Sequence, residues 1–259
     1  MFHTPIEYIG SKPKTRNKRS FSWSWLFMLV IGLSSPLLLK PFYEEAKTAE
    51  ASTNELSTIV DDLDRNGDFS SALAAAALRQ TLHPVMFDDH YYPLAYPGGD
   101  LPRNRGNAAD IVVRSYRQLG LDLQQLVHED MSTHFRSYPQ IFDRNAPDPS
   151  IDHRRVPNLK RFLTRQARSI PVSSFATSYE VGDLVIWRLV DGTPHIGIVV
   201  PGPGVEKEDV WVVHHLGASP VWEPCLFEFS IDAHFRFTPD TSQIPNSVAQ
   251  RDSGKTEEL

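Results

Sequence analysis

Three short apolar runs in the second half of the chain are separated by turn-forming residues. The stretch from Gly182 to Trp187 begins with a Gly-Asp turn signal, His195 to Val200 begins with a histidine, and Val210 to His215 ends with two. Short runs rich in β-branched and aromatic residues between glycines and prolines are typical of strands. The pattern therefore predicts a three-stranded meander in which two strands carry a histidine at one end, where side chains can reach a cleft.

Helical periodicity dominates the residues before this meander, and two more strands are expected after it. The predicted helices are Phe69 to Leu82, Asn107 to Leu119, Leu123 to Tyr138 and Lys160 to Arg168. The additional strands are Cys225 to Phe229 and His234 to Phe237. Helices packed on a small antiparallel sheet make an α+β domain.

The helix that follows Asn107 has the clearest start. Asn107 is a favourable N-cap, and Asp110, three residues later, suits the positive end of the helix dipole. At 100° per residue, Ala108 falls in the first turn on the face that turns inward, and Asp110 lies opposite.

The first 39 residues predict a membrane anchor. Residues 1–20 are basic, and Phe21 to Leu39 contains no charged residue and has two tryptophans near its start. This run is just long enough to span a bilayer as a helix. The basic flank should stay in the cytoplasm, giving a single-pass inner-membrane protein with a periplasmic domain. The alternatives are a cleaved signal peptide, which would leave a secreted protein, and a buried helix of a soluble domain.

The net charge and the cysteine content of the chain argue against several classes of function. The 259 residues carry a net charge of −6, which gives no indication of nucleic-acid binding. The single cysteine, Cys225, excludes an intrachain disulfide and a cysteine-based metal cluster, and its apolar surroundings indicate a small buried residue of a strand. We expect a linker over 40–68, a folded domain over 69–237 and a polar, disordered tail over 238–259.

The two strand-end histidines indicate an incomplete nucleophilic site. A histidine base oriented by a second polar group makes up two parts of a catalytic triad, and His195 and His214 fit these parts. The natural place for a cysteine nucleophile is the first turn of a helix packed on the sheet, where the helix N-terminus favours the thiolate. In this chain that place holds Ala108.

Long motifs beyond residue 90 resemble those of the YijF-like bacterial family, a group of secreted proteins with a domain of unknown function. The matching stretches are Leu126 to Met131, Ile151 to Leu159, Gly182 to Trp187, His195 to Val199 and Ala233 to Arg236. The family pattern Arg-Gly-Val-Cys-Thr-Asp before the helix is replaced here by Arg-Gly-Asn-Ala-Ala-Asp, so that the cysteine position is Ala108 and the threonine position is Ala109.

That family is similar to the NlpC-type cell-wall endopeptidases, and the resemblance implies their papain-like fold. In those enzymes a cysteine at a helix start attacks an amide of the peptidoglycan stem peptide, with a histidine base and a polar orienting residue. By position, the resemblance makes His195 the base, His214 the orienting residue and Ala108 the nucleophile position. An alanine methyl cannot attack a carbonyl, and loss of the nucleophile removes almost all chemical catalysis.

Other polar residues are candidates for ligand contacts. They are Asp110, Asp152, His153, Arg154, Arg155 and His215. Residues 152–155 would form either a structural turn in which arginine pairs with aspartate, or a clamp for a ligand carboxylate, for which arginine geometry is suited. Asp110 could also join His195 and His214 or His215 in a zinc site, although no compact metal-binding spacing is present.

These features together predict a pseudoenzyme. We expect a non-catalytic relative of a cell-wall cysteine peptidase that binds peptidoglycan or an envelope protein through the degenerate cleft, without a cofactor or a metal. The alternative is an active amide hydrolase that uses another nucleophile or a water bound to a histidine-held metal. A purely structural envelope protein, with its cleft filled by side chains, is a third possibility.

Overall fold

The computed structural model describes residues 53–203 and 210–238, all of which belong to one compact unit. The predicted basic segment, the membrane anchor over 21–39 and the tail beyond residue 238 lie outside the described residues. Within the described ranges, every helix is too short or too polar to cross a bilayer.

Apart from the two-residue strands β1 and β2, helices come first along the described chain and strands follow, as expected from the sequence. Residues 53–66 are helical. The elements that follow are α2 (Phe69–Gln80), β1 (Met86–Phe87), β2 (Arg105–Gly106), α3 (Ala108–Gln118), α4 (Leu123–His134), η1 (Phe135–Ser137), η2 (Asp152–Arg154), α5 (Val156–Gln166), β3 (Arg168–Ile170), η3 (Ala176–Ser178), β4 (Leu184–Arg188), β5 (Pro194–Val200), β6 (Trp211–His214), β7 (Val221–Glu223) and β8 (Ser230–Arg236).

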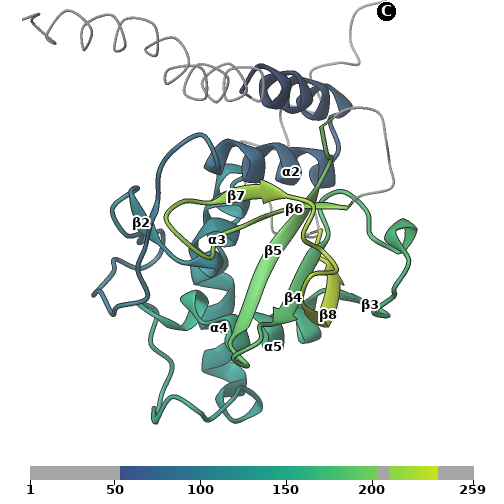
Figure 1. Cartoon of the computed structure of the whole chain (residues 1–259). Coiled ribbons are helices and arrows are strands. Elements are labelled where there is room, and N and C mark those ends of the chain that lie inside the picture. Colours follow the sequence, from purple (N-terminus) through teal and green to yellow (C-terminus); the bar gives the residue numbers. More distant parts are fainter. Residues whose placement is uncertain (1–52, 204–209, 239–259) are drawn as a thin grey trace, which may run out of the picture. The chain divides into compact units, whose positions relative to one another are not determined.

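The strands form an open six-stranded sheet in the order β3-β8-β4-β5-β6-β7, and every neighbouring pair is antiparallel (Figure 1). The predicted meander is confirmed as β4-β5-β6. The expected α+β class is also confirmed. The small parallel pair β1-β2 lies apart from this sheet.

The two faces of the sheet carry different cores because side chains alternate along a strand. Ile186 and Ile196, which are paired across β4 and β5, belong to the main core that the sheet shares with the helices. Trp187 belongs to a smaller core on the other face. Its partner across the two strands is His195, so the register places this histidine on the face of the smaller core.

The predicted strand from Cys225 to Phe229 is wrong. The strand in this region is β7, and residues 226–228 form a turn. Cys225 and Leu226 are buried in the smaller core, and the Leu226 carbonyl accepts a hydrogen bond from the Trp187 indole at 2.9 Å. The apolar character of this stretch therefore reflects burial of a turn, which the sequence pattern does not distinguish from burial of a strand.

The folded unit begins earlier than the sequence indicated. Leu56, Val60 and Leu63, from the helix over 53–66, lie in the main core, although a linker was expected over 40–68. The break before α2 follows from local chemistry. Gly67 adopts a φ of 75°, and the Asp68 side chain caps α2 by accepting from the Ser71 amide.

The predicted start of α3 is confirmed in detail. The Asn107 side-chain oxygen accepts from the amides of Ala109 and Asp110 at 2.9 and 3.2 Å. The Asp110 carboxylate accepts in return from the Asn107 amide at 2.7 Å, which completes a capping box. Ala108 is thereby fixed as the first residue of the helix.

Replacing Asn107 by alanine should lower the free energy of unfolding by about 1 kcal/mol, because two amides at the start of α3 lose their acceptor. Chemical denaturation would measure the loss. Asn104→Ala, at a nearby exposed position, is the matched control and should change stability by less than about 0.5 kcal/mol. Equal effects of the two substitutions would contradict the capping role.

Candidate functional site

The two predicted site histidines lie against each other at the ends of β5 and β6. His195 Nε2 is 3.1 Å from His214 Nδ1, and the two rings are nearly perpendicular, at 87°. The His195 ring stacks on Trp187 with 5.8 Å between ring centroids. Both histidines are buried. The indole therefore covers the contact between the histidines and limits the orientations of the His195 ring.

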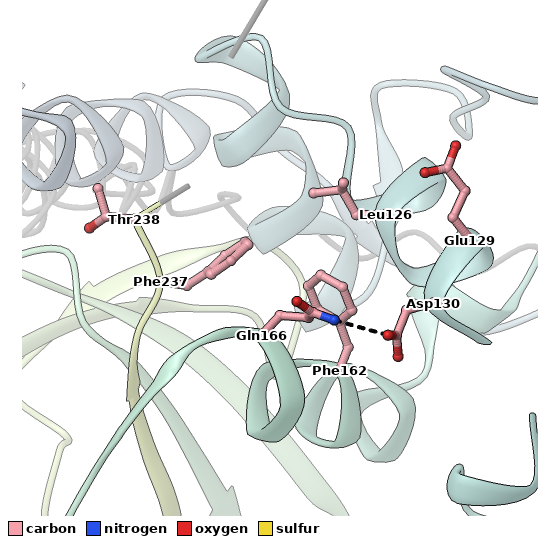
Figure 2. Close-up of a pocket in the computed structure, with 7 residues that line it drawn as sticks. All are labelled: Leu126, Glu129, Asp130, Phe162, Gln166, Phe237 and Thr238. Atoms are coloured by element: carbon pink, nitrogen blue, oxygen red, sulfur yellow. Dashed lines mark hydrogen bonds between the residues drawn. The ribbon is translucent and has the colours of Figure 1, made fainter. Parts of the chain in front are cut away.

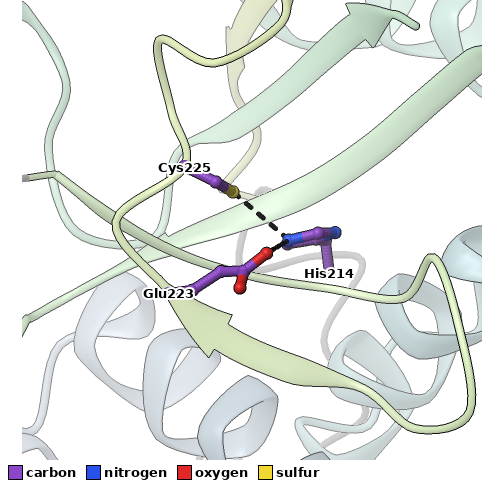
Figure 3. A group of neighbouring side chains, drawn as sticks. All are labelled: His214, Glu223 and Cys225. Atoms are coloured by element: carbon purple, nitrogen blue, oxygen red, sulfur yellow. Dashed lines mark hydrogen bonds and ion pairs between the residues drawn. The ribbon is translucent and has the colours of Figure 1, made fainter.

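Two further residues that the sequence analysis missed complete this group. His214 Nε2 is 2.8 Å from Glu223 Oε1 and 3.2 Å from Cys225 Sγ (Figure 3). Glu223 belongs to β7, and Cys225 follows two residues later. Their approach to His214 depends on the β6–β7 register, which pairs His214 with Val221 and Val212 with Glu223. The sequence held no local signal for this pairing.

The contacts specify where the ring protons lie. A carboxylate only accepts hydrogen bonds, so His214 donates from Nε2 to Glu223 and its Nδ1 is left as an acceptor. His195 must then donate from Nε2 to that atom. This assignment leaves His195 Nδ1 with a free lone pair, which is the form that a general base requires.

Burial keeps both rings neutral. Burial, together with smaller contributions from the nearby His214 and His215, lowers the pKa of His195 to about 3. Burial also lowers the pKa of His214, although Glu223 opposes this shift. The neutral assignment above therefore holds at neutral pH.

Cys225 is a poor nucleophile in this setting. Its side chain is 1 % exposed, and burial raises the pKa of the thiol to about 12 with help from the charges of Glu223 and Glu228. A thiol attacks only as the thiolate, and this one is protonated at neutral pH. Its sulfur contacts His214 Nε2 at 3.2 Å, and not the free nitrogen of His195.

Ala108 lies in the main core, with Ile196, whereas the register turns His195 toward the smaller core. His215 lies near the residues that precede α3, because its ring centroid is 5.9 Å from that of Phe87, and Phe87 pairs with Gly106. His215 follows His214 directly along the chain, and His214 contacts His195, so the two groups of residues are neighbours. The structure thus joins His195 and His214 directly, and the start of α3 approaches this pair through His215.

Arg154 is the centre of a buried network. Its guanidinium donates to Asp110 Oδ1 and Oδ2 at 2.9 and 3.1 Å, and to the carbonyls of Asp88 and His90 at 2.8 and 2.7 Å. Its side chain is fully buried and that of Asp110 is 3 % exposed. These contacts connect η2 to the first turn of α3, which agrees with the predicted structural turn. They also occupy the guanidinium donors that Arg154 would need to bind a ligand carboxylate.

The other predicted ligand contacts are divided between the interior and the surface. Asp152 is buried and accepts a hydrogen bond from the Asp148 amide. His153 is also buried, and burial lowers its pKa to about 4. Arg155 is partly exposed and lies over the Phe142 ring, 3.9 Å from its centroid. Of residues 152–155, Arg155 alone has a side chain placed to meet a dissolved ligand.

Two hollows in the surface lie away from His195 and His214. One of about 280 Å³ lies between α4, α5 and the residues after β8 (Figure 2), where Gln166 donates to Asp130 at 2.9 Å. A larger one, of about 770 Å³, includes four arginines: Arg79, Arg103, Arg114 and Arg117. Neither is lined by a residue that the sequence analysis assigned to the site.

The sequence similarity of this chain to known proteins extends over all of the residues of the site described above. Residues 74–237 match the family described as "Domain of unknown function (DUF1287)". The "Uncharacterized protein YijF" of Escherichia coli (strain K12) is 41% identical over 166 residues, which is 64% of this chain and 80% of that relative. The family match extends over Ala108, both paired histidines, Glu223 and Cys225. The chain therefore belongs to the DUF1287 family and, as its motifs indicated, is a YijF-like protein.

Proposed function

We propose that this chain is a non-catalytic relative of the cell-wall cysteine peptidases. It is anchored in the inner membrane through residues 21–39, and its periplasmic domain, papain-like in plan, binds the peptides of peptidoglycan. The single observation that carries the proposal is a methyl group at the first position of α3, where a cysteine nucleophile would stand.

The surroundings of that methyl group support the proposal. A complete capping box fixes the start of α3, and the helix N-terminus would favour a thiolate there. The His195–His214–Glu223 chain leaves a basic nitrogen on His195, as a peptidase base requires. A methyl group at the nucleophile position and a basic nitrogen kept on His195 support binding without cleavage as the activity of this chain.

The lone thiol of the chain does not replace the missing group. Cys225 is buried, protonated and directed at His214, so it lacks both access to a substrate and a base in the correct position. This observation favours a binding protein over the alternative of a hydrolase with a displaced cysteine nucleophile.

The test is to restore the nucleophile. Full-length Ala108→Cys, purified in detergent, should release muropeptides from purified peptidoglycan, whereas wild type should sediment with peptidoglycan and release none. Mass spectrometry would detect the products. Ala109→Cys is the matched control, since it places a thiol one residue further along α3, where the native side chain is fully buried. It should release nothing.

Second substitutions identify the base. In the Ala108→Cys background, His195→Ala should abolish release and His215→Ala should reduce it less. The reverse order would make His215, the histidine beside the start of α3, the base. Cleavage by wild type that is lost in His195→Ala would establish the hydrolase alternative. Absence of both binding and cleavage in wild type and Ala108→Cys would overturn the proposal.

A further inference from the structure

Three potential metal ligands converge beside the paired histidines. His214 Nε2, Glu223 Oε1 and Cys225 Sγ all lie within 4.8 Å of one another. They come from β6, β7 and the turn that follows, and Figure 3 shows the three side chains directed toward a common point. We propose that these three residues bind a zinc ion.

The ligand set selects for zinc. Thiolate, imidazole and carboxylate are the three side-chain groups that Zn²⁺ binds in proteins, at about 2.3, 2.0 and 2.0–2.2 Å. Calcium and magnesium prefer sites made only of oxygen atoms, so a thiolate disfavours them. This set differs from the zinc site considered from the sequence, since it omits Asp110 and includes the lone cysteine.

The observed separations require little rearrangement. Tetrahedral zinc with these bond lengths holds neighbouring ligand atoms about 3.3–3.5 Å apart. His214 Nε2 is now 2.8 Å from Glu223 Oε1 and 3.2 Å from Cys225 Sγ, so each of these two pairs must separate by about half an ångström or less. The third pair, Glu223 and Cys225, lies within 4.8 Å and must approach by about 1.3 Å at most. The Glu223 side chain is 46 % exposed and is free to make this adjustment.

The surroundings of the three ligands also suit a cation. His195 Nε2 is 3.1 Å from His214 Nδ1, so it is placed to accept the supporting hydrogen bond that a metal-binding histidine donates from its other ring nitrogen. Glu228 adds negative charge close to the thiol. Binding replaces the Cys225 proton with zinc, and that proton leaves to solvent. The His214 proton moves from Nε2 to Nδ1, which frees Nε2 for the ion, and the His195 proton moves from Nε2 to Nδ1, so that His214 Nδ1 donates to His195 Nε2. Because the Glu223 side chain is 46 % exposed, water can reach the site and would supply the fourth ligand that zinc takes.

The lone cysteine makes the test unambiguous. The metal-free full chain would be titrated with Co²⁺, a spectroscopic substitute for zinc, and a cobalt–thiolate absorption band should appear and saturate at one ion per chain. Because the sequence has one cysteine, such a band identifies Cys225 as a ligand. Competition with Zn²⁺ should remove the band, and elemental analysis should find one zinc per chain.

Substitutions distinguish the residues that bind the metal from the residues that only lie near it. Cys225→Ser should abolish the band, and His195→Ala should weaken zinc affinity about 10- to 100-fold through its contact with His214. Glu223→Gln, at a half-exposed position, should weaken affinity even if Cys225→Ser folds poorly. Glu228→Gln is the matched control, since it removes a nearby charge and no ligand, and it should retain the band.

Two results would overturn the site: no cobalt–thiolate band in folded wild type, or zinc content unchanged in Glu223→Gln and Cys225→Ser. The result of the cobalt titration does not depend on the proposed function, because the titration uses neither the Ala108→Cys variant nor peptidoglycan. A protein that binds peptidoglycan but does not bind cobalt or zinc would refute the zinc site alone. A zinc protein that does not bind peptidoglycan would refute the binding function alone.

Discussion

Replacing Arg154 by methionine should lower the free energy of unfolding by about 3–5 kcal/mol. The substitution leaves the Asp110 carboxylate 3 % exposed and without its guanidinium partner. It also removes the donors to two carbonyls, those of Asp88 and His90, in the loop before α3. Removal of one partner from a buried ion pair is costly because the remaining charge stays desolvated. Urea denaturation, followed by circular dichroism, would measure the loss.

Arg155→Met provides the matched control for this substitution. Arg155 is the next residue, is partly exposed, and makes a cation–π contact with Phe142. Loss of that contact should cost about 1 kcal/mol or less. If Arg154→Met and Arg155→Met are equally destabilising, Arg154 does not have the structural role that its contacts indicate, and the alternative of a ligand clamp would be favoured instead.

Asp183→Asn should lower the free energy of unfolding by about 3 kcal/mol at neutral pH. The Asp183 carboxylate is completely buried and accepts from His234 at 2.7 Å and from two nitrogens of Arg236 at 2.7 and 3.0 Å. These contacts join the start of β4 to β8. Burial alone would raise the pKa of Asp183, but the hydrogen bonds from His234 and Arg236 outweigh burial and hold it below the usual value.

The lowered pKa gives this effect a definite pH dependence. A carboxyl whose pKa is lower in the folded state stabilises the protein fully above the pKa of an unfolded aspartate, about 4. This contribution is lost as the pH falls below that value toward the pKa of the folded state. The stability of wild type should therefore decline more steeply than that of Asp183→Asn below about pH 4.

The matched control for Asp183 is Asp191→Asn in the exposed β4–β5 turn. It should change stability by less than about 1 kcal/mol at neutral pH. Parallel stability curves of wild type and Asp183→Asn between about pH 3 and pH 7 would show that the carboxylate network does not contribute as inferred.

Local chemistry explains which parts of the fold the sequence predicted. The start of α3 was predictable because Asn107 and Asp110 satisfy neighbouring amides within one turn. The meander was predictable because its apolar runs are bounded by turn residues. The turn at Cys225 was not, since burial in the smaller core gives it the composition of a strand.

Nonlocal pairing explains what the sequence did not predict in the site. The contact of His195 with His214 was expected from their places at neighbouring strand ends. The contacts of His214 with Glu223 and Cys225 depend on the register of a strand that had not been predicted. The partner of Arg154 is Asp110, 44 residues away along the chain, and their pairing follows only from the packing of η2 against α3.

The strand order has a consequence for crowding in the cell. The two longest strands, β5 and β8, with seven residues each, occupy interior positions, so each has a hydrogen-bonded neighbour on both sides. The outermost strands, β3 and β7, have three residues each. An unpaired strand edge is a template for fibril growth, and short edges limit it. At high local concentration, the domain therefore offers a second copy little backbone on which to polymerise.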